Sequence, residues 1–318
     1  MSAGSIGPVV RWLVLLASVP CIAICLLTPT ARWWFTGATL ANASLHAAIL
    51  LLPAVVVWRT RPRVSAGLLI AMLCGAAPWL IAAWQTRAPL PVAERPVIQV
   101  ASANLYLYND KALRAPALAA VLAERPAIVV LAEAIASEDR AGVSPIDYPY
   151  QLWQQQPNRK WRDCVALLSR YPIVRSTPHD LEEQPFLEAT LDIDGRPLHV
   201  IAVHTMSPVS ATKLEQRNQQ LHDIAEVIVD LTQREPAPVL LMGDCNLAVG
   251  TPAWRDLAAR SQLKRVAQAE PATWPDWLGP VAITIDHILG RDLALGPQRA
   301  FIIPGSDHRG LRGSIQLP

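Results

Sequence analysis

The chain has 318 residues, and its charged residues are divided unevenly along its length. Residues 1–96 contain seven arginines and a single acidic residue, Glu94, whereas residues 97–318 contain 25 acidic and 21 basic residues. The second segment therefore has a net charge of 21 − 25 = −4, which disfavours a protein that binds nucleic acid mainly through its phosphates.

Three apolar stretches open the chain, at residues 9–27, 38–58 and 64–84. The second and third contain no Asp, Glu, Lys or Arg, and about 20 helical residues suffice to cross a bilayer core. We therefore predict that residues 1–84 form a membrane anchor of three transmembrane helices. A cleaved signal peptide is an alternative for the first stretch alone, and a buried helical hairpin is an alternative for the set.

The arginines predict how such an anchor is oriented. Arg59, Arg61 and Arg63 lie in the short loop between the second and third stretches, and positive loops stay in the cytoplasm. Three spans then place everything after residue 84 outside the cytoplasm. This predicts a multi-pass protein of the cell (inner) membrane with an extracytoplasmic C-terminal domain.

Residues 85–96 are rich in proline and lack periodicity, which predicts a short, semi-rigid linker before a domain of residues 97–318. Cys164 and Cys245 are the only cysteines in that domain, and a disulfide between them is left open at this point.

The pattern of residues 97–318 predicts short strands mixed with a few helices. The predicted helices are 112–124 and 213–233, and the predicted strands are 97–103, 127–131, 164–169, 188–192, 198–203, 239–242, 281–288, 300–303 and 313–316. This order predicts an α/β fold in which a two-sheet β-sandwich is flanked by helices.

Polar residues follow six of these strands, where an ordinary core does not need them. They are Asn104, Glu133, His204, the pair Asp244 and Asn246, the pair Asp286 and His287, and the triplet Ser306, Asp307 and His308. Each alone has an ordinary explanation, because Asn and Asp form turns and a lone His is usually structural. If the six ends meet at one edge, however, they form a cleft with four carboxylates, two amides and up to three histidines.

Such a cleft predicts a particular chemistry. Four carboxylates close together repel one another and take up protons unless a cation neutralises them. Oxygen ligands favour Mg²⁺ or Mn²⁺ over zinc, and the cation would polarise a phosphoryl oxygen. A histidine beside an aspartate can serve as an acid or base near neutral pH. These groups suit attack by water on a phosphate ester or anhydride.

The ordered motifs resemble the endonuclease/exonuclease/phosphatase superfamily over essentially all of residues 97–318. They are Asn104, Val130-Leu-Ala-Glu133, Leu167-Leu-Ser-Arg-Tyr-Pro172, His204, Gly243-Asp-Cys-Asn246, Thr273-Trp274, Ile285-Asp-His-Ile288 and Ser306-Asp-His308. The resemblance implies a metal-dependent hydrolase of phosphoric esters or anhydrides. It implies that Glu133 is the principal metal ligand, supported by Asn104 and by Asp307.

The same resemblance implies roles for the remaining polar residues. Asp244 would orient or deprotonate the attacking water, and Asn246 would bind the phosphoryl group. His204 would donate a hydrogen bond to a phosphoryl oxygen. His308, steered by Asp286, would be the acid/base residue or an electrostatic stabiliser.

The sequence also departs from the family pattern. Cys245 replaces a bulky aromatic residue, and the active-site tyrosine of abasic-site nucleases has no clear counterpart, with Tyr148 and Tyr150 as candidates. Arg217 and Asn218 either help to hold a substrate phosphate or form a surface salt bridge.

Three functions remain in competition at this point. An anchor before this domain resembles the membrane-bound phosphatase-like proteins associated with teicoplanin resistance, which implies a phosphorylated, lipid-linked substrate at the bilayer. The first alternative is an extracytoplasmic metal-dependent nuclease, and the second is a binding module without activity.

Overall fold

The structure is a computed structural model, and it describes residues 7–155, 163–179 and 186–318. The chain divides into two compact units. The first unit comprises Met1–Gln85 and Val249–Arg255, and the second comprises Thr86–Ala248 and Asp256–Pro318.

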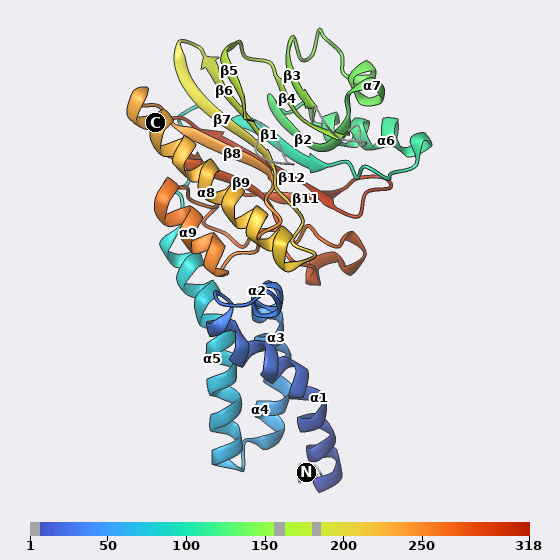
Figure 1. The fold of residues 1–318 in the computed structure, drawn as a ribbon, viewed down its shortest axis with the longest axis vertical. Coiled ribbons are helices and arrows are strands. Elements are labelled where there is room, and N and C mark those ends of the chain that lie inside the picture. Colours follow the sequence, from blue (N-terminus) through green and yellow to red (C-terminus); the bar gives the residue numbers. More distant parts are fainter. Residues whose placement is uncertain (1–6, 156–162, 180–185) are drawn as a thin grey trace. The chain divides into compact units, whose positions relative to one another are not determined.

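The first unit is helical (Figure 1). Its elements are α1 (Pro8–Leu27), the 3₁₀ turn η1 (Thr28–Thr30), α2 (Phe35–Ala41), α3 (Ser44–Leu50), α4 (Leu52–Trp58) and α5 (Pro62–Gln85). Among the described residues, α1, continued by η1, and α5 are long and apolar enough to cross a membrane. The number of candidate spans rises to three only if α2 and the helices that follow it form one span.

The second predicted span, residues 38–58, is not a single straight helix, because the chain bends by 62° between α2 and the helices of Ser44–Trp58. The bend lies at Asn42, whose side-chain amide donates to the carbonyl of Thr39 (3.2 Å). Asn side chains compete in this way for backbone groups and interrupt helices. Pro53, at the start of α4, lacks the N–H that a continuous helix would need there.

The helices of the first unit bury mainly small residues, together with Leu51, Trp58 and Leu68, and expose many other large apolar residues. Cys25, Ala47 and Ala71 are buried in the centre, whereas Leu16 and Leu73 are each 64% exposed. Helices that meet through small side chains and turn leucines outward are typical of a lipid environment. The two or three apolar helices therefore indicate membrane insertion.

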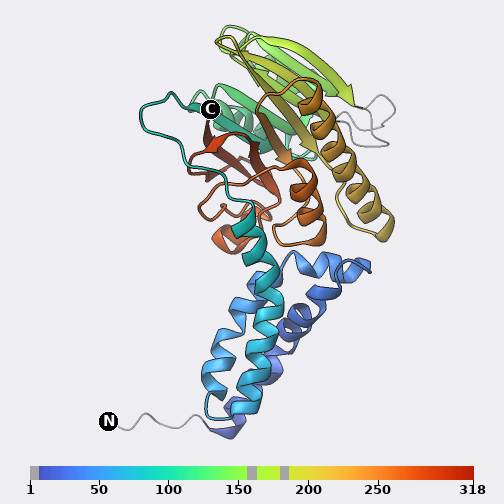
Figure 2. The ribbon, with the colours of Figure 1, turned by 90° about the vertical axis from the view of Figure 1, so that its left-hand side faces the viewer.

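The second unit contains two sheets (Figures 1 and 2). The seven-stranded sheet has the order β10 (Ala294–Leu295), β12 (Arg309–Gln316), β1 (Ile98–Asn104), β2 (Ile128–Ile135), β4 (Asp163–Ser169) and β3 (Tyr150–Gln155), with β11 (Arg299–Ile302) also paired to β12. The five-stranded sheet has the order β5 (Ile173–His179), β6 (Phe186–Ile193), β7 (Arg196–His204), β8 (Val239–Asp244) and β9 (Asp286–Arg291). The pairs β1–β2 and β7–β8 are parallel, so β1 and β2 end at one edge of their sheet, and β7 and β8 do so in the other.

The two sheets enclose the main core. Apolar side chains alternate along the strands, so that Val130 and Leu167 of one sheet share a buried cluster with Val200 and Met242 of the other. A second cluster lies on the outer face of the seven-stranded sheet, where α6 (Lys111–Leu122) buries Leu118 and Val121. The amphipathic α8 (Ala211–Arg234) runs beside the five-stranded sheet (Figures 1 and 2). The predicted fold class, two sheets flanked by helices, is confirmed.

Some predicted elements differ in detail from those observed. The strands β3 and β5 and the helix α9 (Pro252–Ser261) had no prediction. The strand predicted at 281–288 begins only at Asp286, because Pro275, Pro280 and Gly279 (φ +58°) favour the irregular 3₁₀ segment η3 (Asp276–Val281). Cys164 and Cys245 are both buried, and no disulfide joins them.

The proline-rich segment is bound along the second unit. The N–H of Ala88 donates to the carbonyl of Arg265 (2.8 Å), and the side chain of Gln316 pairs with both the N–H and the carbonyl of Val92 (2.8 and 2.9 Å). The segment that the sequence predicts as a linker is therefore held by the domain that follows it.

Candidate active site

Asn104 joins the ends of strands from both sheets. Its side-chain amide donates to Glu133 Oε1 and to Asp244 Oδ2, both at 3.0 Å. Asn104 ends β1 and Glu133 lies in β2, whereas Asp244 ends β8 in the other sheet. Asn104 is completely buried, so its amide would be costly to leave unpaired. The ends of β1, β2 and β8 therefore meet at Asn104, which is the arrangement that the sequence analysis considered.

Glu133 is placed by an irregularity of β2. The pairing of β2 with β4 shifts between Leu131 and Ala134, and Glu133 has a φ of +51°. Such a backbone conformation costs about 1–3 kcal/mol in a non-glycine residue and is concentrated at functional sites. The N–H of Leu107 donates to Glu133 Oε2 (2.6 Å). Burial raises the pKa of Glu133, but the neighbouring His204 and this hydrogen bond outweigh burial and hold it below the ordinary value.

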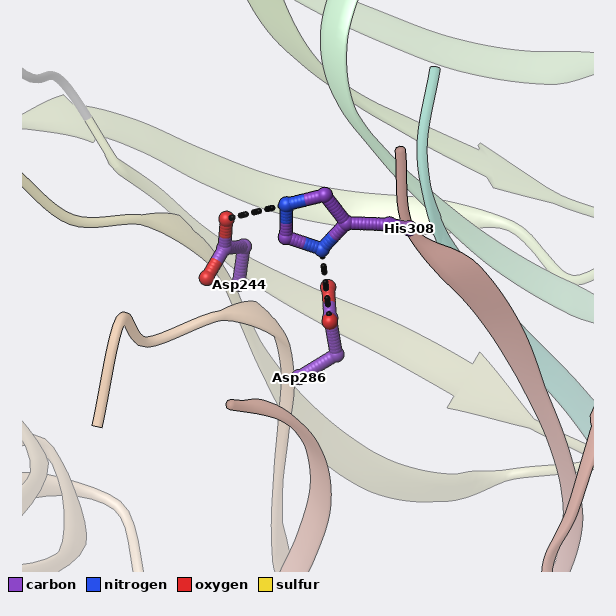
Figure 3. Close-up of side chains that lie close together, drawn as sticks. All are labelled: Asp244, Asp286 and His308. Carbon is purple, nitrogen blue, oxygen red and sulfur yellow. Dashed lines mark hydrogen bonds and ion pairs between the residues drawn. The ribbon is translucent and has the colours of Figure 1, made fainter. Parts of the chain in front are cut away.

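His308 lies between two aspartates (Figure 3). Its Nδ1 is 2.8 Å from Asp286 Oδ2, and its Nε2 is 3.8 Å from Asp244 Oδ2. The hydroxyl of Ser306 accepts a hydrogen bond from the N–H of His308 (3.0 Å) and donates to the carbonyl of Asn104 (2.8 Å). The loop before β12 is thereby fixed to the end of β1.

The charges of this group depend on one another. Burial and the nearby Asp286 raise the pKa of Asp244 to about 6. Burial alone would lower the pKa of His308, but Asp286 and Asp244 have a larger, opposite effect and raise it to about 10. At neutral pH the site therefore holds an imidazolium between two carboxylates, which partly neutralises them.

His204, at the end of β7, lies beside the same carboxylates. Its Nε2 is 3.5 Å from Glu133 Oε1 and 3.9 Å from Asp244 Oδ2. These distances are longer than hydrogen bonds, so the imidazole is near both oxygens without being tied to either.

Asn246 is held by a turn after β8. Its N–H donates to Asp244 Oδ1 (2.8 Å), its side-chain amide donates to the carbonyl of Thr205 (3.0 Å), and its φ is +46°. The Nη1 of Arg217 donates to the carbonyl of Asn246 (2.5 Å), and its Nε donates to Asn218 (3.0 Å). Arg217 is 3% exposed, and burial lowers its pKa to about 10. It therefore supports the Asn246 turn from within α8 and does not form a surface salt bridge.

Asp307 is hydrogen-bonded to a tryptophan. Its Oδ2 accepts a hydrogen bond from the indole N–H of Trp274 (3.1 Å). Its Oδ1 is buried and, among the described residues, has no hydrogen-bond partner. The same holds for Oδ1 of Asp286.

The residues present fit a hard cation. Ligand atoms of Asp244, Asp286 and His308 lie within 4.8 Å of one another, but a protonated His308 has no lone pair for a metal, so carboxylates would hold the cation. The two orphaned carboxylate oxygens, on Asp286 and Asp307, are the type of ligand that Mg²⁺ and Mn²⁺ prefer. Glu133, with its low pKa, adds a carboxylate that is ionised at neutral pH. The oxygen of the Asn104 amide accepts from the N–H of Tyr106 (2.9 Å), so Asn104 would have to turn its amide to bind a cation through oxygen.

His287 does not join this group of side chains, so only two of the three histidines that the sequence offered, His204 and His308, belong to it. It is fully buried behind Asp286, with Nε2 2.7 Å from the carbonyl of Leu247 and Nδ1 3.5 Å from Glu270 Oε1. The other carboxylate oxygen of Glu270 accepts from Nε of Arg265 (3.1 Å). Successive residues of a strand point to opposite faces, so the alternation could have revealed this placement. Nothing in the sequence marks Glu270 or Arg265.

Tyr148 does not supply the tyrosine of the abasic-site nucleases. Its ring is buried in the cluster on the outer face of the seven-stranded sheet, and its hydroxyl donates to the carbonyl of Pro126 (2.8 Å). Tyr150, the other candidate, lies at the start of β3, which ends its sheet.

Comparison with known proteins agrees with this geometry. The sequence model described as "Endonuclease/Exonuclease/phosphatase family" matches residues 101–308. No curated protein matches the chain. The catalytic domain of human Nocturnin, solved with a bound sulfate anion, is similar in fold with a TM-score of 0.60 and 20% identity, over 74% of this chain and 99% of that domain.

Two further solved structures show the same fold. An endonuclease/exonuclease/phosphatase from Bacteroides vulgatus has a TM-score of 0.58 and 15% identity, over 70% of this chain and all (100%) of its own. A humanized TDP2 of D. rerio has a TM-score of 0.55 and 16% identity, over 69% of this chain and 99% of its own.

Proposed function

This chain belongs to the Endonuclease/Exonuclease/phosphatase family, and from that membership we propose that it is a divalent-metal-dependent phosphoesterase that hydrolyses a lipid-linked phosphate ester or pyrophosphate. Members of the family are hydrolases of phosphoesters and generally use divalent metals. The observation that carries the proposal is the buried group in which Asn104 links Glu133 to Asp244 and His308 links Asp244 to Asp286.

The bound cation would be Mg²⁺ or Mn²⁺, held by Glu133 with Asn104 and Asp307 as further ligands, and it would polarise the phosphoryl group. Asp244 orients the attacking water and accepts its proton. A pKa of about 6 suits this role, because Asp244 is ionised at neutral pH while its basicity remains close to the operating pH.

The histidines and Asn246 act on the phosphoryl oxygens. His308, held by Asp286 and protonated at neutral pH, stabilises the negative charge that develops during attack. His204 lies 3.5 Å from Glu133 and donates to a second oxygen when substrate is present. Asn246 contributes the amide hydrogen that is not used by Thr205.

The proposed substrate is lipid-linked because the same chain carries two or three apolar helices of membrane-spanning length. A tether at the bilayer brings the site to molecules that are themselves held there. The arginine loop between α4 and α5 supports an orientation in which the hydrolase domain lies outside the cytoplasm. The net charge of −4 and the buried Tyr148 favour this substrate over DNA or RNA.

The test uses the full chain in lipid nanodiscs with Mg²⁺. The substrates are a polyprenyl diphosphate, a nucleotide and a supercoiled plasmid, and released phosphate or nicked DNA is measured. We expect phosphate release from the polyprenyl diphosphate, with a loss of about 10²–10⁴-fold in Asp244→Asn because the base is removed.

Asp292→Asn is the matched control, since this carboxylate is 72% exposed and outside the site. It should retain full activity. Hydrolysis that survives both chelation and Asp244→Asn would contradict the proposal. Plasmid nicking that Asp244→Asn abolishes, without lipid phosphate release, would establish a nuclease instead.

A further inference from the structure

The segment η3 and the tryptophan before it expose apolar side chains to solvent. Trp277 is 76% exposed and Val281 is 62% exposed, while Trp274 and Leu278 are about a third exposed (37% and 36%). Apart from Asp276, residues 274–281 contain no charged side chain. A run of this kind marks an interaction surface more often than an ordinary loop.

The same segment is fastened to the residues of the site. The N–H of Asp276 donates to the carbonyl of Asp307 (2.8 Å), and the indole of Trp274 donates to the carboxylate of Asp307 (3.1 Å). The hydroxyl of Thr273 accepts from the N–H of Asp286 (3.3 Å). The segment with the exposed apolar side chains is therefore hydrogen-bonded directly to Asp307, one of the proposed metal ligands.

The chemistry of the segment favours lipid over other occupants. It offers no lysine or arginine for a polynucleotide. Tryptophan, with an apolar body and one N–H, is the residue that membrane–water interfaces favour. The chain would also be held at a bilayer by its own helices. The candidate span α5 ends at Gln85, and the second unit, which carries the site and is called the hydrolase unit below, begins at Thr86.

We propose that residues 274–281 dock on the bilayer that anchors the chain, inserting Trp277, Leu278 and Val281 among the lipids beside the active site. This inference rests on the proposed function and deepens it. With the segment docked, a phosphate that projects from the lipid surface would lie near the site residues to which the segment is hydrogen-bonded, Asp307 and Asp286. It predicts that the segment matters for lipid-borne substrates and not for soluble ones.

The test compares two substrates on the full chain in vesicles of phosphatidylcholine and phosphatidylglycerol. One substrate is a polyprenyl diphosphate in the vesicle, and the other is the best water-soluble phosphoester of the panel above. In Trp277→Ser, kcat/KM should fall about tenfold for the lipid substrate, since interfacial anchoring is lost, and stay unchanged for the soluble one. Trp277→Phe, which keeps an aromatic ring, should restore most of the lipid activity.

Ile146→Ser is the matched control, because Ile146 is also apolar and 91% exposed but lies in the loop before β3. It should change neither activity. As a second readout, brominated lipids in the vesicle should quench the fluorescence of the wild type more than that of Trp277→Phe, since only the wild type has a tryptophan at this position.

Three results would overturn the inference. Equal losses for both substrates would show that the segment is part of the site itself. Unchanged activity together with unchanged quenching would show that it does not meet the bilayer, and loss of self-association in Trp277→Ser would assign it to a second copy of the chain. A wild type that hydrolyses no phosphoester would instead refute the proposed function, while the quenching measurement would still decide on docking.

Discussion

At the scale of single residues, the site is an arrangement of buried charges that fix one another's protonation. His308 remains a cation because Asp286 and Asp244 surround it, and Asp244 holds its proton more tightly than an exposed aspartate because it is buried next to Asp286. The residues that the sequence singles out thus acquire their chemical states only from their neighbours.

The pH dependence of activity follows from these two residues. We expect kcat/KM to rise as Asp244 loses its proton, with a pKa of about 6, and to fall as His308 loses its proton, with a pKa of about 10. Because a bound dication favours the ionised carboxylate, saturating Mg²⁺ should move the acidic limb below pH 6. The measurement is a pH–rate profile on one substrate.

The His308→Gln variant separates the two limbs. It should lower kcat/KM by about 10²–10³-fold, since a donor to the developing charge is lost, and the remaining activity should no longer decline toward pH 10. An alkaline limb that persists in His308→Gln would assign that limb to another group.

At the scale of elements, buried side chains outside the site support the turn that follows β8. His287, on β9, donates a hydrogen bond from Nε2 to the carbonyl of Leu247, the residue after Asn246. Its other ring nitrogen lies near Glu270, which is paired with Arg265. Because none of these three side chains contacts the carboxylates of the site directly through a hydrogen bond, we expect their effect on catalysis to pass through the position of the Asn246 turn.

We expect His287→Ala to destabilise the hydrolase unit by about 1–3 kcal/mol, because a buried carbonyl and the Glu270 carboxylate lose a partner. Activity should fall mainly through kcat, since the Asn246 turn loosens. His287→Gln, which keeps one hydrogen-bonding group, should recover part of both. The measurements are thermal unfolding and steady-state kinetics, and a variant as stable and active as the wild type would contradict this account.

Gly243 has a separate structural reason to be glycine. Its φ is +139°, and a Cβ added there would lie 1.9 Å from the carbonyl oxygen of Val203 on β7. Gly243→Ala must therefore push β7 from β8 beside Asp244 and should destabilise the fold by roughly 3 kcal/mol or more. Gly195→Ala is the control: its φ of +83° is also strained, but its added Cβ meets no atom within 4 Å. Equal losses in unfolding temperature for the two variants would contradict the steric explanation.

At the scale of the whole molecule, the protein combines a hydrolase fold with a set of apolar helices, many of whose leucines face outward. With the bend at Asn42, two helices have the length and composition of membrane spans, and a third span requires that the bent pair crosses the bilayer. The side of the membrane on which the hydrolase unit lies depends on that number, since an odd number of spans separates the two chain ends.

The orientation can be measured directly. With three spans and the loop of Arg59, Arg61 and Arg63 in the cytoplasm, an alkaline phosphatase reporter fused after Pro318 should be active, and a fluorescent protein that folds only in the cytoplasm should be dark. Replacing the three arginines with glutamine should give a mixed orientation. The opposite reporter pattern in the unmodified chain would contradict an extracytoplasmic hydrolase domain.

The amino-acid sequence by itself determined the fold class, the apolar helices and the residues of the cleft. Strand periodicity and the polar residues that follow each strand are local properties, so Asn104, Glu133, His204, Asp244 and His308 could be selected without coordinates. The family could be identified from the ordered motifs between residues 101 and 308 for the same reason.

Only the tertiary structure decided how these residues act together. That His308 pairs with Asp286, that Asp307 turns to Trp274, and that His287 supports Leu247 all depend on strand register and on loops that pack from distant parts of the chain. The shifted pKa values of Asp244 and His308 depend on burial, which is a property of the whole fold. The sequence names the groups, but solvent exclusion and distance set their charges.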